Sequence, residues 1–174
     1  PVCLFSSYVW NHALNRKAAK HIKDISPGCL VIFGGPHVPK YLGETESFLR
    51  ENPFVDVAVI GEGELALAEI LEAFASTPRQ KRNLNKLEGI TGIVYRNGDA
   101  FKRTPDRQRL ADIDVLPSPY LTGEFEPWFE DLPSTILETN RGCPYGCTYC
   151  DWGSATLSKV TRFAPERVVK EIEY

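Results

Sequence analysis

Short, continuous apolar runs alternate with amphipathic stretches along the first 75 residues. The runs fall at residues 2–5, 30–33 and 55–60. Each is rich in β-branched or aromatic residues without polar alternation, which is typical of strands buried on both faces of a parallel sheet. Apolar residues at helical spacing predict helices over residues 15–25, 41–50 and 65–74. This order of elements predicts an α/β fold of Rossmann-like type with a parallel sheet.

Each predicted strand ends in small or polar residues. Ser6 and Ser7 follow the first run, Gly34 and Gly35 the second, and a Gly-Glu-Gly-Glu stretch at 61–64 the third. In an open parallel sheet, ligands bind beyond the carboxyl ends of the strands. Glycines there let a backbone approach a ligand closely, although a simple strand-to-loop turn explains Gly-Gly-Pro equally well. No GxGxxG or GxxxxGK[ST] pattern indicates a dinucleotide or P-loop site.

The second half of the chain begins with a connector. Asn97-Gly98 between apolar residues predicts a β-hairpin, and a high density of prolines after residue 104 excludes long helices. A further strand is predicted at 134–139, directly before a group of cysteines. A final helix is predicted from Pro165, because proline is favoured at the first helical position. The predicted domains are residues 1–76, 77–133 and 134–174.

Composition and charge narrow the function mainly by exclusion. The 174 residues carry 20 basic and 23 acidic side chains, so a broad nucleic-acid-binding surface is not expected. No apolar run approaches the roughly 18–20 residues that span a bilayer, and no signal peptide opens the chain. A cytoplasmic protein without a membrane span is therefore expected. The chain has no methionine and stops within a helical pattern, so we expect an internal segment of a longer protein.

Three of the five cysteines, Cys143, Cys147 and Cys150, form a CxxxCxxC pattern on a Gly/Pro-rich loop. Such thiolates can converge on an iron–sulfur cluster or a structural zinc ion. Zinc needs a fourth ligand and no histidine is near in the sequence, whereas three thiolates on a four-iron cluster leave one iron open. The pattern therefore favours the cluster, and zinc with a remote ligand stays the alternative. Cys3 and Cys29 are expected in the core.

The stretch from Arg141 to Cys150, with an aromatic residue before the third cysteine, resembles the cluster loop of the radical S-adenosylmethionine (SAM) superfamily. The resemblance implies that Cys143, Cys147 and Cys150 hold a [4Fe–4S] cluster, and that Tyr149 contacts SAM. It also implies reductive cleavage of SAM to a 5′-deoxyadenosyl radical, with flavodoxin or ferredoxin as the reductant. In that superfamily the loop follows the first strand of a partial TIM barrel, so residues 134–174 are expected to begin one.

The first 75 residues are similar to the cobalamin (B12)-binding domains that precede some radical SAM barrels. The similarity rests on the order of four stretches and a connector: Phe5-Ser6-Ser7-Tyr8-Val9-Trp10-Asn11, Gly34-Gly35-Pro36-His37, Val55-Asp56, Gly61-Glu62-Gly63-Glu64 and the connector Leu116-Pro117-Ser118-Pro119-Tyr120. It implies cobalamin contacts at Ser6, Ser7, Tyr8, Gly34, Gly35, Gly61, Glu62, Gly63 and Glu64. The Asp-x-His-x-x-Gly motif, which ligates cobalt in some members, is not in this chain. Trp10 and Asn11 either line the corrinoid crevice or cap the first helix.

Together the resemblances imply a B12-dependent radical SAM enzyme that acts on a small-molecule substrate. The commonest reaction of that architecture is methyl transfer from methylcobalamin to an unactivated carbon. Radical chemistry without methylation, such as ring contraction or cyclisation, is one alternative, and a non-catalytic zinc- or cluster-binding module is another. The 174-residue chain alone is expected to bind a cluster weakly and to be inactive, because most of the barrel would lie outside it.

Overall fold

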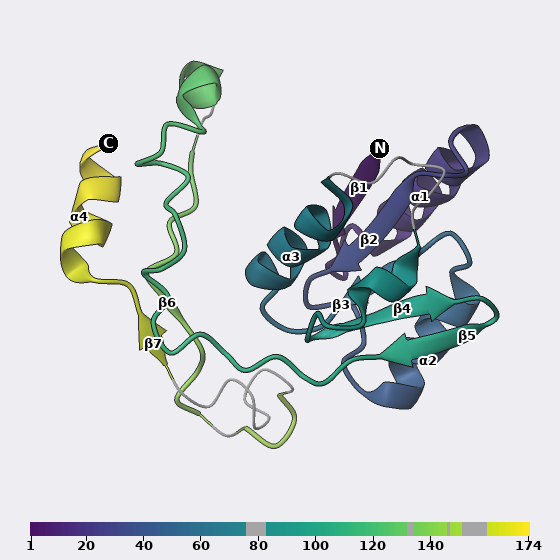
Figure 1. The fold of residues 1–174 in the computed structure, drawn as a ribbon. Coiled ribbons are helices and arrows are strands. Elements are labelled where there is room, and N and C mark those ends of the chain that lie inside the picture. Colours follow the sequence, from purple (N-terminus) through teal and green to yellow (C-terminus); the bar gives the residue numbers. More distant parts are fainter. Residues whose placement is uncertain (76–82, 132–133, 146, 151–159) are drawn as a thin grey trace. The chain divides into compact units, whose positions relative to one another are not determined.

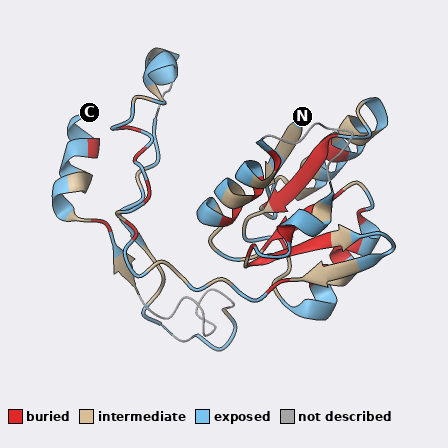
Figure 2. Ribbon diagram, in the orientation of Figure 1, coloured by how far each residue is buried: buried red, intermediate tan, exposed pale blue. Residues whose placement is uncertain are grey.

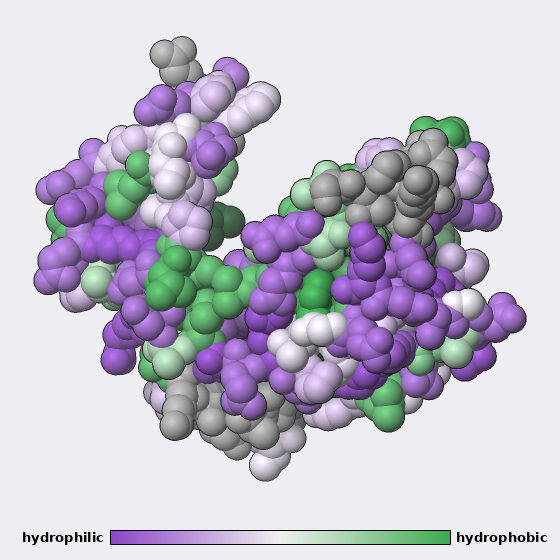
Figure 3. All heavy atoms as spheres, in the orientation of Figure 1, coloured by the Kyte–Doolittle hydropathy of each residue, from purple (hydrophilic) through white to green (hydrophobic). Residues whose placement is uncertain are grey.

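The computed structural model of the chain describes residues 1–75, 83–131, 134–145, 147–150 and 160–174. The chain divides into two compact units, Pro1–Gln108 and Arg109–Tyr174, each with its own secondary structure (Figure 1). Within the described ranges, no helix combines the length and apolar character needed to cross a membrane. Hydrophilic residues cover most of the face drawn in Figure 3, and hydrophobic residues form scattered patches between them.

The first unit is a five-stranded sheet with helices on both faces (Figure 1). In sheet order, its strands are β1 (Val2–Ser6), β2 (Leu30–Gly34), β3 (Val57–Val59), β4 (Ile93–Asn97) and β5 (Ala100–Arg103). Its helices are α1 (His12–Ile25), α2 (Leu42–Glu51), α3 (Glu64–Ala75) and the 3₁₀ helix η2 (Leu84–Leu87). The first three strands pair in parallel, which confirms the predicted α/β core.

The sheet as a whole is mixed, which corrects the expectation of a purely parallel one. The predicted hairpin β4–β5 joins the sheet, and β4 pairs antiparallel with β3. Ala58 of β3 lies opposite Val94 of β4, and both are fully buried. Since β4 also buries Ile93 and Tyr95, the pairing removes a substantial apolar surface from water.

Two apolar layers hold this unit together, one on each face of the sheet (Figure 2). Neighbouring residues of β2 point to opposite faces, as the strand period of two requires. Val31 packs in the cluster that contains Phe48 of α2, and Ile32 packs in the cluster that contains Ile70 of α3. Burial on both faces explains the continuous apolar runs of β2 and β3. The expectation of the same burial for the run at 2–5 is wrong, because β1 is an edge strand without a fully buried residue and Leu4 is 49% exposed.

The second unit has little regular structure in its described part. It contains the 3₁₀ helix η3 (Glu126–Asp131), the antiparallel pair β6 (Asn140–Arg141) and β7 (Thr161–Arg162), and α4 (Pro165–Glu173). Helix α4 confirms the predicted helix with proline in its first turn. The strand predicted at 134–139 is wrong, since only the two residues that follow it are paired. Ile136 is 89% exposed, so no burial favours a strand there.

Candidate functional site

The carboxyl ends of β1, β2 and β3 meet at one edge of the sheet, because the three strands are parallel (Figure 1). The register places Ser6 beside Gly34 at the ends of β1 and β2. We call residues 6–8, 34–37 and 61–64 the strand-end edge. The nine positions predicted to contact cobalamin all lie at or just beyond these strand ends.

Ser7 connects the loop after β1 to two other elements. Its side chain is fully buried, its N–H donates to Gly34 O at 2.7 Å, and its hydroxyl lies 2.7 Å from Nδ1 of His12 at the start of α1. The Ser7 carbonyl accepts from the N–H of His37 at 2.9 Å. The buried Ser7 therefore holds the loop after β1 against the end of β2 and the start of α1. The backbone of this loop is ordered without a ligand.

Glycine is required at Gly35 for two reasons. Its φ is +91°, and a Cβ there would lie 2.9 Å from both the N and the O of Ser7. Gly61 also has a positive φ, +78°, but open space around it. A turn thus accounts for both glycines without a ligand, and Gly35 keeps the β1 and β2 loops in close contact.

The acidic stretch at 61–64 leads into α3. Glu64 is the first residue of the helix, where a carboxylate is stabilised by the helix dipole. The carbonyl of Gly63 accepts from Leu67 N–H at 2.8 Å, so helical bonding already starts there. The helix start therefore explains Glu64 without a ligand, and a ligand role for Glu62 and Glu64 stays a prediction.

The loop after β1 presents an aromatic pair. Tyr8 and Trp10 stack with their ring centroids 4.6 Å apart, and Trp10 is 77% exposed. Asn11 accepts from Tyr8 N–H at 2.8 Å and donates to Ser6 O at 3.0 Å. Asn11 makes no side-chain cap bond to α1, so it stabilises the loop rather than the helix.

A contact between two histidines at this edge was not predicted from the sequence. The rings of His12 and His37 have centroids 4.3 Å apart. Burial, followed by the charges of His37 and Arg16, lowers the pKa of His12. The two histidines follow two neighbouring parallel strands, β1 and β2. Their proximity could have been predicted from that topology.

Two hollows on the first unit lie largely away from the strand-end edge. The larger, about 650 Å³, is lined by charged residues of α1 such as Arg16 and Lys20, together with Phe54. The smaller, about 430 Å³, is lined by His37 and residues of α2. Neither of these two hollows is lined by a predicted cobalamin position.

The three loop cysteines lie in the second unit, between β6 and β7. All are free thiols; Cys147 is exposed, and Cys143 and Cys150 are partly exposed. The N–H of Cys150 donates to Cys147 O at 3.1 Å, which turns the chain between these two. Within the described ranges, no three His, Cys, Asp or Glu side chains are grouped so that they could hold a metal ion. The thiol donors suit an iron–sulfur cluster, but they are not gathered in advance. Tyr149 is 91% exposed.

Comparison with known proteins shows relatives over almost the whole chain. No family model matches. The chain is 41% identical over 180 residues to 2-(S-pantetheinyl)-carbapenam-3-carboxylate methyltransferase of Streptantibioticus cattleyicolor, covering 99% of this chain and 25% of that protein. It is 38% identical over 179 residues to the cobalamin-dependent radical SAM methyltransferase TokK of Streptomyces tokunonensis, with the same coverage of 99% and 25%. Its homologues are cobalamin-dependent radical SAM methyltransferases and related enzymes.

The relatives also include a cyclase. The chain is 28% identical over 158 residues to the anaerobic magnesium-protoporphyrin IX monomethyl ester cyclase of Cereibacter sphaeroides, covering 86% of this chain and 24% of the cyclase. The chain thus spans about a quarter of the length of these curated relatives. The resemblance stated from the motifs is confirmed, and the coverage agrees with the expected segment of a longer enzyme.

Proposed function

We propose that the protein carrying this sequence is a B12-dependent radical SAM methyltransferase that methylates an unactivated carbon of a small molecule. The observation that carries the proposal is the 41% identity, over 99% of this chain, to a methyltransferase. The two units support it with complementary features. In the first unit, the strand-end edge brings together the ends of three parallel strands. In the second unit, one loop carries three free thiols.

In this proposal Cys143, Cys147 and Cys150 hold the [4Fe–4S] cluster, and Tyr149 contacts SAM. When bound, the cluster supplies an electron and an open iron for the cleavage of SAM to a 5′-deoxyadenosyl radical. The chain itself holds the thiols: β6 and β7 bound the loop, and the turn from Cys147 to Cys150 directs the last two ligands. Cys147 is exposed and the other two thiols are partly exposed, which leaves them accessible to iron and sulfide.

The strand-end edge is the proposed cobalamin site, where bound methylcobalamin supplies the methyl group. Gly34 and Gly35 keep side chains away from the end of β2, and Gly61 and Gly63 do the same after β3. Ser6, Ser7 and Tyr8 form the loop from β1, whose exposed aromatic surface is the Tyr8–Trp10 stack. Glu62 and Glu64 place carboxylates beside the same edge as acceptors for a corrinoid amide.

Product analysis with methyl-labelled SAM tests the reaction in the polypeptide that carries this sequence. We expect the label in the substrate-derived product. Formation of 5′-deoxyadenosine without label in the product would remove the methyl-transfer proposal and retain the radical chemistry. The 174-residue chain alone is expected to release no 5′-deoxyadenosine, and its production by that chain would contradict this expectation.

A second candidate is radical SAM chemistry that closes or contracts a ring without methylation. The similarity to the Cereibacter sphaeroides cyclase favours it. The same labelling experiment separates the two candidates, because ring closure leaves the methyl group of SAM on methionine. An unlabelled cyclised product would establish the second candidate in place of the first.

We also propose a reducing, cytoplasmic location and a reductant such as flavodoxin or ferredoxin. All five cysteines are free thiols, as is usual in a reducing compartment. The Sγ atoms of Cys3 and Cys29 lie only 3.6 Å apart without a disulfide. The test is to add purified reduced flavodoxin to the reconstituted protein. Reduction of the cluster is measured as a loss of its visible absorbance.

A further inference from the structure

The cysteine loop is closed at its base by a very short ladder. Asn140 pairs with Arg162 and Arg141 pairs with Thr161, and Phe163 N–H donates to Thr139 O at 3.1 Å. An isolated two-stranded ladder is marginally stable at best in water. The entry and exit of the loop therefore need support from elsewhere in the second unit.

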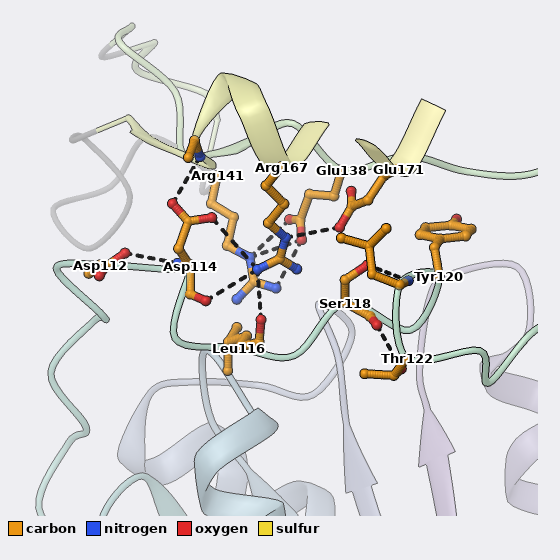
Figure 4. Close-up of polar contacts among 12 residues, drawn as sticks. Asp112, Asp114, Leu116, Ser118, Tyr120, Thr122, Glu138, Arg141, Arg167 and Glu171 are labelled. Atoms are coloured by element: carbon orange, nitrogen blue, oxygen red, sulfur yellow. Dashed lines mark hydrogen bonds and ion pairs between the residues drawn. The ribbon is translucent and has the colours of Figure 1, made fainter. Parts of the chain in front are cut away.

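The exit of the loop is supported by the connector. Asp114 Oδ2 accepts from Ala164 N–H at 2.9 Å, at the start of α4 (Figure 4). Ala164 is the N-cap of this helix and has no capping side chain of its own. Asp114 therefore supplies, from 50 residues earlier in the chain, the acceptor that a helix N-terminus needs.

Arg167 ties the first turn of α4 to the same stretch. Its Nη1 donates to Leu116 O at 2.7 Å and to Asp114 O at 3.3 Å. Its Nε donates to Glu171 at 2.9 Å, and its guanidinium lies 4.3 Å from the centroid of the Phe163 ring. These donors are directed by one rigid fork, which lysine cannot reproduce.

The charged side chains of Arg167 and Glu171 are largely shielded from water. The Arg167 side chain is 15% exposed and that of Glu171 is 4% exposed. Burial opposes ionisation of Glu171, but hydrogen bonds from Ser118 and Arg167 outweigh it, and the pKa of Glu171 lies below its usual range. Removal of one partner would leave the others poorly solvated, so the arrangement resists displacement.

The connector also holds the entry of the loop. The hydroxyl of the buried Tyr120 lies 2.8 Å from Thr135 Oγ1 and donates to the carbonyl of Ile136. The segment that contains these two residues leads directly into β6. One stretch, 114–120, thus contacts both the chain that enters the cysteine loop and the chain that leaves it.

We propose that residues 114–120 form a clamp that sets the base of the cysteine loop, with Asp114 and Arg167 as positioning residues for the iron–sulfur cluster. The inference rests on the proposed function, because it assigns the clamp to the cluster held by Cys143, Cys147 and Cys150. The clamp acts through the backbone: it holds the segment that leads into β6 and the start of α4, and so limits the positions that the three thiols can take.

The test compares reconstituted clusters in the longer polypeptide that carries this sequence and in its variants by electron paramagnetic resonance after reduction. Arg167→Ala and Asp114→Ala are expected to shift the g values and to speed iron loss to a chelator about tenfold. Arg167→Lys and Asp114→Asn should give smaller changes of the same kind. Lys170→Ala, which alters an exposed residue of the same helix, should match the unmodified chain.

The outcomes separate a positioning role from a stabilising one. A contact that only stabilises the fold would lower the amount of cluster but leave the g values of the remainder unchanged, and that result would overturn the inference. If the alanine variants do not fold, the g values of Arg167→Lys and Asp114→Asn decide in the same way. If the unmodified longer polypeptide that carries this sequence takes up no iron and sulfide, the proposed function itself fails, and the inference fails with it.

Discussion

The strand-end edge and the cysteine loop differ in how their residues are held. At the edge, backbone hydrogen bonds of the sheet fix the loops after β1 and β2, and Ser7 is buried between them. The cysteine loop is closed by a two-residue ladder, and its thiols are not grouped for a metal. The chain itself therefore orders the edge, whereas it does not gather the three thiols; in the proposed function, metal binding would complete the loop.

Because of this difference, substitutions at the two regions are expected to affect stability and binding differently. A change in the sheet loops is expected to alter stability and ligand binding together, since the same backbone serves both. A change in the thiols is expected to abolish metal binding and leave the first unit intact. The following predictions test this separation.

The largest effect is expected from replacing the three loop cysteines together by serine. Iron retained after anaerobic reconstitution should fall to background, because serine is a poor ligand for iron in a sulfide cluster. Cys3→Ser is the matched control, since Cys3 lies in β1, and it should retain the iron of the unmodified chain. Equal iron in both proteins would show that the metal lies elsewhere.

Gly35→Ala is expected to destabilise the first unit by about 1–3 kcal/mol. The new methyl group would lie 2.9 Å from the Ser7 backbone at a φ of +91°. Hydrogen exchange of buried β2 amides measures the free energy of opening of this unit. Hydroxocobalamin affinity, followed by absorbance, should fall in parallel.

Alanine substitutions at two other glycines serve as comparisons for the loss of stability expected at Gly35. Gly61→Ala should cost about 1–2 kcal/mol, since it has a positive φ but open space. Gly43→Ala, within α2 and with nothing near its Cβ position, should stabilise the helix by up to about 1 kcal/mol. A large loss at Gly43 would contradict the steric explanation for Gly35.

Acidification is expected to destabilise the first unit through His12. Its pKa is lowered, by burial first and then by the charges of His37 and Arg16. The unfolded chain therefore binds a proton more readily, and the free energy of unfolding falls as the pH drops below about 6.5. His12→Gln should flatten this dependence, measured by β2 amide exchange, whereas Lys17→Gln should keep it. A steeper fall in His12→Gln would contradict the sign.

The smallest effect on stability is expected at Trp10. Since this side chain is 77% exposed, Trp10→Ala should change the free energy of unfolding by less than about 0.5 kcal/mol. Hydroxocobalamin affinity should nevertheless fall, because the exposed part of the Tyr8–Trp10 stack is lost. Leu14→Ala, at a residue of α1 that is 69% exposed, is the control. Equal affinity in the two variants would remove Trp10 from the proposed site.

Much of the first unit follows from local pattern. The buried runs at 30–33 and 55–60 predict β2 and β3, and Asn97-Gly98 predicts the β4–β5 hairpin. The pairing of β4 with β3 could not be predicted, because it joins residues that are distant in the sequence. The contact of His12 with His37 depends on the same long-range arrangement.

The second unit shows the limits of local pattern more clearly. Residues 134–139 have the composition of a strand, but strand formation depends on a partner, and the structure shows pairing only at Asn140 and Arg141. The spacing of the three cysteines predicts the candidate thiol donors, because that pattern is local in the sequence. The Asp114–Arg167 clamp joins segments about 50 residues apart, so no local signal predicts it.

Iron and acid-labile sulfide in the anaerobically reconstituted polypeptide that carries this sequence test the central claim most directly. We predict iron and sulfide in equal amounts, together with a reduced-state paramagnetic signal that changes when SAM is added. Retention of zinc with no sulfide-dependent absorption would contradict the account and would leave Cys143, Cys147 and Cys150 as ligands of a structural metal.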